Sequence, residues 1–179
     1  ALRRQMHRDF RKPLIVMSPK SLLRHKRVTS TFEDFIGDRS FHRVLWDDHE
    51  DLVTDKKIRR IVLCAGKVYY ELLEAKEKRD INDVYVLRLE QIYPFPDKAL
   101  AEELARFPNA EILWCQEEPR NAGAWTFVEP RLEDLFAEIG SKPSRPGYAG
   151  PPAMASPAPG SMAHHKKQMA QLVDDALII

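Results

Sequence analysis

The sequence predicts an α/β domain with a mostly parallel sheet flanked by helices. Short apolar runs alternate with segments of about ten residues that carry a helical pattern, which is typical of strand–helix–strand units. The chain has 179 residues, enough for one domain with a real core, or for one domain and a tail. Its hydrophobic share of 44% and charged share of 31% are typical of a soluble globular protein.

The first quarter of the chain carries short apolar runs between capping signals. Ser18 can cap a helix, and Pro19 suits the first turn of that helix. Ser30 or Thr31 can cap a second helix, which Gly37 would end. The expected elements are a buried strand over 13–17 (PLIVM), a helix over 18–24, a helix over 30–37 and a strand over 41–47.

Three apolar runs in the middle of the chain are each followed by a helical pattern. The first run ends at Gly66, and the segment after it places Tyr69, Leu72 and Leu73 on one face of a helix. Further along the chain, Pro130 is expected to break one helix and open the next. The expected elements are strands over 59–67, 83–91 and 111–116, helices over 68–79 and 96–107, and a helical region over 124–139.

The composition changes after residue 140. Residues 141–161 contain six prolines and three glycines, and such a segment cannot build a packed core by itself. Residues 161–177 then form an amphipathic helix, which must dock on its own domain or on a partner through the stripe Met169, Leu172, Val173 and Ala176. The expected organisation is a linker helix or tail of an upstream domain over 1–12, an α/β domain over 13–140, and a Pro-rich arm with a terminal helix over 141–179.

Charge and cysteine content exclude several classes of protein. The formal net charge of +1 gives no overall bias toward nucleic acid or membrane, and no apolar stretch reaches membrane-spanning length. Cys64 and Cys115 both lie in apolar runs, which indicates buried, reduced thiols in a reducing compartment.

The stretch ILWCQEEPRNAGAW, residues 112–125, has the appearance of an active site. Its adjacent carboxylates, Glu117 and Glu118, follow a predicted strand, and ligands collect at the carboxyl ends of strands in open parallel sheets. Paired carboxylates can divide acid and base work between them. However, adjacent residues at a strand end point in different directions, and no His, Ser or metal-ligand spacing accompanies them. The favoured interpretation is that one carboxylate caps the next helix and the other makes an interface salt bridge.

Basic residues offer a second kind of candidate site. Residues 1–27 contain nine Lys/Arg and one acid, Asp9, and this cluster could bind a phosphate-bearing ligand, meet an acidic partner, or be a solvated face. Lys20 and Arg24 are four apart, so an α-helix would place them on one face. The residues expected to hold an anionic effector are Arg4, Lys20 and Arg24, with Lys67 of the CAGK turn as a weaker fourth. His164 and His165 are adjacent, which is poor geometry for a metal.

Five long stretches, in this order and at workable spacings, resemble one family. Together they are similar to the C-terminal part of the 2-oxoglutarate dehydrogenase decarboxylating component, the thiamine-diphosphate-dependent first component of that complex. The resemblance covers nearly the whole chain and departs from the family pattern at Gly147 and Pro151, where arginines are common, and at Ala65, where serine is usual. The stretches are RKPLIVMSPKSLLRH (11–25), CAGKVYYELLEA (64–75), RLEQIYPFP (88–96), WCQEEPRNAGAW (114–125) and YAGPPAMASPAPG (148–160).

The resemblance implies a transketolase C-terminal-like domain within a longer enzyme of the tricarboxylic acid cycle. The intact enzyme would decarboxylate 2-oxoglutarate on thiamine diphosphate with Mg²⁺ and pass the succinyl group to the lipoyl arm of the dihydrolipoyl succinyltransferase component. The upstream domains would hold the cofactor, so this segment is expected to be inactive alone, with no catalytic, thiamine-binding or metal-binding residue.

The same resemblance implies partners and a compartment. The upstream domains of the chain and the second subunit of a homodimer are the expected neighbours, with Glu117, Glu118 and Trp125 at the interface. Neither nucleic acid nor membrane is expected as a partner. The bacterial cytoplasm is the expected compartment, with the mitochondrial matrix as the alternative. The alternative function is a regulatory module that binds a nucleotide or an acyl-CoA.

Overall fold

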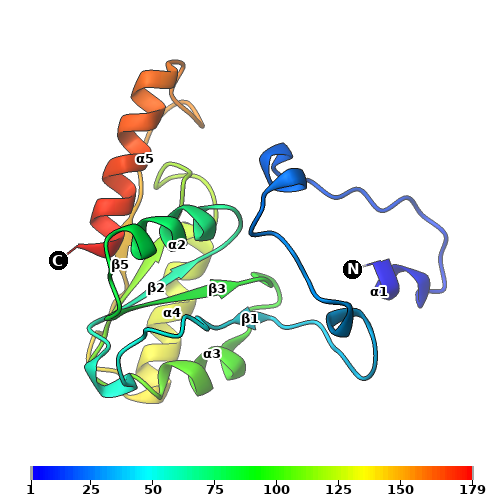
Figure 1. Ribbon diagram of the computed structural model, residues 1–179, viewed down its shortest axis with the longest axis horizontal. Helices are drawn as coiled ribbons and strands as arrows, with labels where there is room; N and C mark the ends of the chain where they lie inside the picture. Colours follow the sequence, from blue (N-terminus) through cyan, green and yellow to red (C-terminus); the bar gives the residue numbers. More distant parts are fainter. Residues whose placement is uncertain (1, 179) are drawn as a thin grey trace. The chain divides into compact units, whose positions relative to one another are not determined.

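The computed structural model describes residues 2–178, and its internal contacts divide the chain into two compact units (Figure 1). The division falls between Arg39 and Ser40. The expected domain boundaries, after residues 12 and 140, stay a prediction.

The second unit is built on a five-stranded sheet in the order β1-β3-β2-β4-β5. Strands β2 to β5 run parallel to one another, and the two-residue β1 runs antiparallel to its neighbour β3. The α/β class with a mostly parallel sheet is therefore confirmed. The strands are β1 (Val44–Leu45), β2 (Arg60–Cys64), β3 (Val84–Leu89), β4 (Glu111–Cys115) and β5 (Gly147–Ala149).

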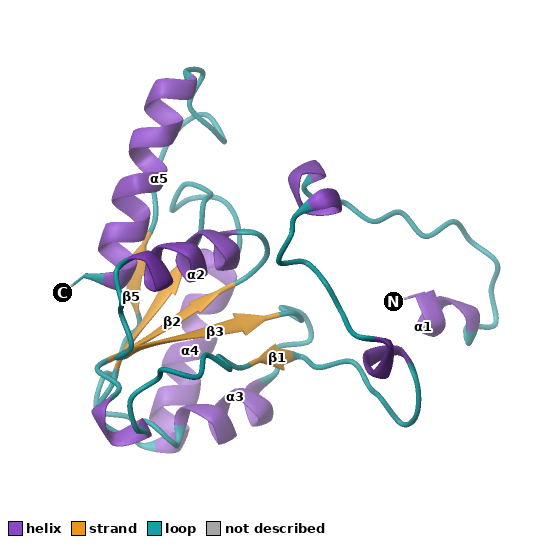
Figure 2. Cartoon of the chain, in the orientation of Figure 1, coloured by secondary structure: helices purple, strands orange, loops and turns teal. Residues whose placement is uncertain are grey.

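Helices cover both faces of this sheet (Figure 2). Alternate residues of a strand point to opposite faces, so Ile61 contributes to one core and Val62 to the other. The first core contains apolar side chains of α3 and α4, and the second contains those of α2 and α5. The helices are α2 (Val68–Lys78), α3 (Asp97–Leu104), α4 (Trp125–Ile139) and α5 (Met162–Leu177), with a short 3₁₀ helix, η3 (Asp55–Lys57), before β2.

One expectation for this unit was wrong. Pro130 does not break the helical region, because α4 is continuous and contains it. Pro130 removes one N–H···O=C hydrogen bond from the helix. Val128 before it and Leu132 after it are both fully buried, so packing against the core holds the two halves of α4 together. Part of the Pro-rich arm also packs on the domain. Its β5 pairs with β4, and Ala149 is buried against the sheet.

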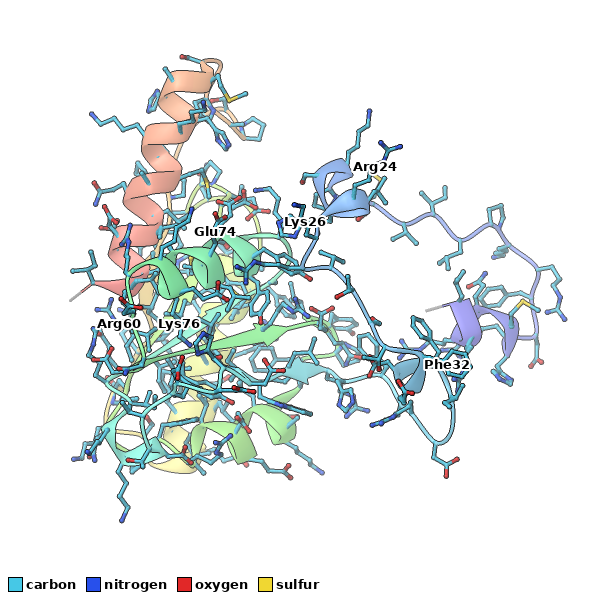
Figure 3. All side chains as sticks on the ribbon, viewed as in Figure 1. Arg24, Lys26, Phe32, Arg60, Glu74 and Lys76 are labelled. Atoms are coloured by element: carbon cyan, nitrogen blue, oxygen red, sulfur yellow. The ribbon has the colours of Figure 1, made fainter. Side chains whose placement is uncertain are left out.

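Helix α5 docks on its own domain, which confirms one of the two expected locations. Leu172 and Ala176 are buried in the core beneath α2. The C-terminal end of α5 is also held by the buried Arg60 of β2 (Figure 3), whose Nη1 donates to the carbonyls of Asp175, Ala176 and Ile178 at 3.0–3.1 Å. These carbonyls have no partner within the helix, so a buried guanidinium is a fitting cap.

One ion pair lies entirely inside the second unit. The ammonium group of Lys76 on α2 contacts the carboxylate of Asp47, and both side chains are at most 2% exposed. The Asp47 carboxylate also accepts the N–H groups of Val86 at 3.0 Å and His49 at 3.2 Å. The pair therefore ties α2, β3 and the segment after β1 together around one buried site.

The first unit contains three short helices, α1 (Leu2–Met6) and the 3₁₀ helices η1 (Lys20–Arg24) and η2 (Phe32–Phe35). The expected strand over 13–17 was wrong for this chain, because the segment belongs to no strand and its side chains are exposed. Ser18 caps nothing, since η1 begins after Pro19 without a side-chain cap. Thr31 does cap η2, and its N–H donates to Asp34 at 2.8 Å.

Candidate functional site

The candidate site lies at the carboxyl ends of β2 and β4. These parallel neighbours are paired with Cys64 opposite Cys115, so the residues that follow the two strands come close together. Lys67 follows β2, and Glu117 follows β4. The Lys67 ammonium contacts the carboxylate of Glu117 and also that of Glu71, at 2.8 Å. The structure therefore joins two of the sequence-predicted residues, Lys67 and Glu117, in one ion-paired group.

Burial and charge shift the pKa values of this group. Burial raises the pKa of Glu117, and the neighbouring Lys67 opposes that rise without cancelling it. Burial by itself would lower the pKa of Lys67, but hydrogen bonds and charges from Glu117 and Glu71 outweigh it, so the pKa of Lys67 is raised. Structural ion-pair networks perturb pKa values as active sites do. Here the Glu117 carboxylate is paired with the Lys67 ammonium.

Gln116 organises the loop that carries the two carboxylates. Its side-chain oxygen accepts the indole N–H of Trp114 and the backbone N–H of Trp125, both at 2.9 Å. Its amide nitrogen lies 2.9–3.2 Å from the carbonyl oxygens of the loop residues Glu118, Pro119 and Ala122. The side chain is nearly completely buried, so these bonds fix the path from β4 to α4.

Two glycines leave room for this arrangement. Gly123 has a φ of +64°, and a Cβ there would lie 3.0 Å from Gln116 Nε2 and from Glu118 Cβ. A Cβ at Gly150 would lie 2.7 Å from the backbone oxygen of Gln116, and 2.6 Å from the Tyr148 hydroxyl. Only glycine fits both positions without displacing the backbone or the Gln116 side chain.

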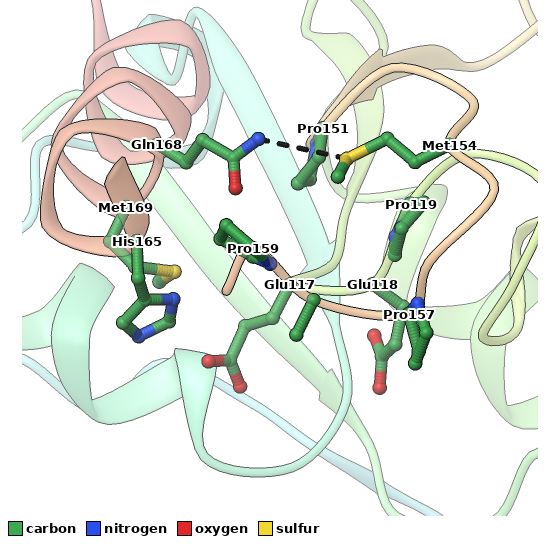
Figure 4. A pocket seen from close by; sticks show the side chains of 11 residues that line it. Glu117, Glu118, Pro119, Pro151, Met154, Pro157, Pro159, His165, Gln168 and Met169 are labelled. Carbon is green, nitrogen blue, oxygen red and sulfur yellow. Dashed lines mark hydrogen bonds between the residues drawn. The ribbon is translucent and has the colours of Figure 1, made fainter. Parts of the chain in front are cut away.

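A cavity of about 240 Å³ adjoins the two carboxylates (Figure 4). It lies between the loop after β4, the Pro-rich arm and the first half of α5. Figure 4 shows the carboxylate groups of Glu117 and Glu118 set well apart, which does not suit a pair that shares one proton. The lining residues are Glu117, Glu118, Pro119, Pro151, Met154, Pro157, Ala158, Pro159, His165, Gln168 and Met169.

Trp125 lies inside the domain. The residue is 2% exposed, and its ring packs against Tyr148 with the ring centroids 4.8 Å apart. The guanidinium of Arg120 lies 5.5 Å from the centroid of the Trp125 ring. The interface role that the resemblance implies for Trp125, Glu117 and Glu118 stays a prediction.

The predicted effector residues divide between the two units. Arg4, Lys20 and Arg24 belong to the first unit, where all three side chains are exposed, and Lys67 belongs to the second. Lys20 and Arg24 lie in a 3₁₀ helix, in which residues three apart share a face, so the one-face argument from α-helical spacing was wrong. The effector site itself stays a prediction.

The two cysteines are free and buried, as their apolar surroundings predict. Burial raises the pKa of the Cys64 thiol to about 12 and also raises the pKa of Cys115 well above its ordinary value. Both thiols are therefore protonated at neutral pH and make poor nucleophiles.

Within residues 2–178, no three His, Cys, Asp or Glu side chains gather as a metal site would require. None of the helices in the same range combines the length and the apolar character that crossing a bilayer requires.

Sequence reasoning missed Gln116 and Arg60. Each is a polar residue at one end of an apolar strand run, Arg60 at the start of β2 and Gln116 directly after β4. A polar residue at such a position can indicate a side chain that makes several hydrogen bonds, because a polar side chain buried at a strand end needs hydrogen-bond partners.

The fold and the strand-end loop define a class of protein module. The mostly parallel five-stranded sheet with helices on both faces is an α/β module, and its architecture is consistent with a transketolase C-terminal-like domain.

Comparison with known proteins identifies the family. Residues 29–177 match the family described as 2-oxoglutarate dehydrogenase C-terminal. The chain is also 60% identical, over 183 aligned positions, to 2-oxoglutarate dehydrogenase E1 components of Brucella anthropi, Brucella ovis and Brucella canis. Each alignment covers 98% of this chain and 18% of the relative, so the chain spans about a fifth of their length. The chain belongs to the 2-oxoglutarate dehydrogenase C-terminal family.

Proposed function

We propose that this chain is the C-terminal domain of a 2-oxoglutarate dehydrogenase E1 component and acts there as a scaffold that supports the dimer. The observation that carries the proposal is the loop after β4, in which Gln116 is bonded to the loop itself and Glu117 is engaged by Lys67. The polar groups of Gln116 and Glu117 thus make contacts within the domain, which supports a structural role for them. The 60% identity to E1 components supports the assignment of this domain to an E1 polypeptide.

The reaction proposed for the intact enzyme is the decarboxylation of 2-oxoglutarate, followed by transfer of the succinyl group to a lipoyl arm. Thiamine diphosphate with Mg²⁺ supplies the carbanion chemistry when bound. The strand-end site does not fit a diphosphate with Mg²⁺, because its ammonium group, on Lys67, and its carboxylate, on Glu117, are already paired with each other. We assign that cofactor to the rest of the E1 polypeptide, since this chain aligns with only 18% of an E1 component.

The contribution proposed for this domain is the orientation of its neighbours. Glu118 is exposed and lies beside an apolar cavity walled by prolines, and this combination suits a basic side chain with an apolar stem. The upstream domains and the second subunit of a homodimer are the proposed sources of that side chain. The succinyltransferase component is the proposed partner of the whole enzyme, and the bacterial cytoplasm is its proposed compartment.

An anion-binding regulatory module remains the second candidate function. The exposed side chains of Arg4, Lys20 and Arg24 support it, because guanidinium and ammonium groups suit the phosphates of a nucleotide or an acyl-CoA. The pairing of Lys67 with two carboxylates weighs against a contribution from that residue.

An activity comparison tests the proposed function. The full-length polypeptide should turn over 2-oxoglutarate with thiamine diphosphate, Mg²⁺ and an artificial electron acceptor, whereas the 179-residue chain should stay at background. A thermal melt of each protein would control for folding. Turnover by the 179-residue chain alone, or none by a folded full-length protein, would contradict the proposal.

A further inference from the structure

The cavity beside the loop after β4 has walls that are fixed within this chain. Asn121 holds the Pro-rich arm at Met154, because its Nδ2 donates to the Met154 carbonyl at 2.9 Å and its Oδ1 accepts the Met154 N–H at 3.0 Å. The carbonyl of Pro151 accepts the N–H of Arg120 and the hydroxyl of Tyr148, both at 3.0 Å. The cavity of about 240 Å³ is therefore largely pre-formed, as small binding sites usually are.

The walls of this cavity are apolar and offer few hydrogen-bond donors. Four of the lining residues are prolines, which have no N–H group. Met154 and Met169 add flexible apolar side chains, and the N–H of Met154 is already taken by Asn121. An anion needs several donors around it, so the cavity is a poor site for a phosphate or a carboxylate.

The polar groups at the edge of the cavity are mainly acceptors. Glu118 is exposed, and within residues 2–178 its carboxylate makes no hydrogen bond or ion pair. The amide nitrogen of Gln168 lies 3.7 Å from a methionine sulfur, and Figure 4 shows the oxygen of the same amide on the side that faces Pro159. The carboxylate of Glu117 adds a second negative charge at the edge. This set of groups calls for a cation that carries several donors.

A guanidinium group fits these acceptors better than an ammonium group does. Figure 4 shows Glu118 and Gln168 on different walls of the cavity, so one ligand must donate in more than one direction. A guanidinium presents five N–H donors in a planar fork and is weakly hydrated, whereas an ammonium is compact and strongly hydrated. The aliphatic stem of an arginine would lie against the prolines. Lys67 already engages Glu117, so Glu118 would be the main charged partner.

We propose that this cavity binds a guanidinium group on an aliphatic stem, and that its occupant in the assembled enzyme is an arginine side chain from the E1 segments outside this chain. Charge complementarity selects a cation. The chain aligns with only 18% of an E1 component, so most of that polypeptide lies outside it and can supply the side chain. The source of the arginine rests on the proposed function, whereas the preference of the cavity for a guanidinium does not.

Titration with n-butylguanidinium tests the preference of the cavity. In the 179-residue chain carrying ¹³C-labelled methionine methyl groups, the NMR signals of Met154 and Met169 should shift and saturate with a Kd of about 1–20 mM. The signals of Met6 and Met17, in the first unit, should not move. n-Butylammonium should bind at least about threefold more weakly, and n-butyl phosphate should cause no shift. The proposal would be overturned by equal binding of n-butylammonium, by binding of n-butyl phosphate, or by no saturable shift with n-butylguanidinium.

The full-length protein tests the source of the occupant. There the resident arginine should fill the cavity, so n-butylguanidinium should leave the signals of Met154 and Met169 unchanged. Shifts equal to those of the 179-residue chain would overturn the proposal, because the cavity would then be open in the assembled enzyme. Turnover of 2-oxoglutarate by the same sample reports on the proposed function, so the two can fail independently.

A pair of variants of the 179-residue chain tests the role of Glu118. Glu118→Gln should weaken the binding of n-butylguanidinium by at least about threefold, because it keeps the shape of the side chain and removes one charge of the ion pair. Glu102→Gln is the matched control, since Glu102 is also exposed but lies on α3, away from the cavity. The control should bind the probe as wild type does, and thermal melts should show both variants folded. A folded Glu118→Gln chain that binds the probe with wild-type affinity would overturn the proposal.

Discussion

Replacing Lys76 with Met should lower the free energy of unfolding by about 3–5 kcal/mol, the cost of breaking a buried ion pair by removing one partner. The Lys76 side chain is fully buried, and methionine is similar in shape, so the variant changes charge more than packing. The Asp47 carboxylate would remain buried with only the N–H groups of Val86 and His49 as partners. Urea unfolding of the 179-residue chain measures the loss.

The matched control is Lys78→Met, two residues further along α2. Lys78 pairs with Glu74 at the surface, where their side chains are 71% and 53% exposed. Exposed pairs of this spacing contribute about 0.3–0.5 kcal/mol, so the control should unfold almost as wild type does. A loss below about 1 kcal/mol for Lys76→Met would contradict the view that this pair is buried and isolated from water.

Replacing Gln116 with Leu should destabilise the chain by about 2–5 kcal/mol. The change would leave the indole N–H of Trp114 and the backbone N–H of Trp125 without their common acceptor in a buried setting. Each unsatisfied buried donor costs about 1–3 kcal/mol, and the loop carbonyls would lose their donor as well. Chemical unfolding gives the magnitude, and faster hydrogen exchange in residues 116–125 would show that the loss is local.

Gln168→Leu provides the control for this second change. Gln168 lies on α5 beside the cavity, and its amide nitrogen lies 3.7 Å from the sulfur of Met154, a weak acceptor. Its replacement should alter stability by less than about 0.5 kcal/mol. Equal effects of the two substitutions would show that Gln116 is not the organising residue of the loop.

The central fold was accessible from sequence because it depends on local pattern. The runs around Val62, Val86 and Leu113 are apolar on both faces, and each is followed by a helical pattern, so a parallel sheet with covered faces is the simple solution. The strand over 13–17 carries the same signal, yet a strand forms only where neighbours pair with its backbone. Within the described residues of this chain, those neighbours are missing. The sequence pattern therefore predicts a strand over 13–17, but it does not show whether neighbouring strands are there to pair with it.

Other features depended on contacts between distant segments. A proline inside a helical segment favours a break in the helix. At Pro130 tertiary packing overrides this preference, because both flanking helical turns are buried. The pairing of β5 with β4 depends on backbone hydrogen bonds, and a segment rich in proline and glycine carries no sequence pattern that predicts them. The approach of Lys67 to Glu117 follows from the order of β2 and β4 in the sheet, which no single motif encodes.

We propose that the loop after β4 serves structure and assembly rather than proton transfer. The most direct measurement is the kcat and the dimer stability of full-length Glu117→Gln and Glu118→Gln proteins, measured on the same samples. Each variant keeps the shape of its side chain and removes its charge. We expect kcat per assembled dimer to stay within about threefold of wild type, while the dimer dissociates or melts more readily in at least one variant. A fall in kcat of about 10²–10⁴-fold with the dimer intact, as expected for a lost general acid or base, would contradict the claim.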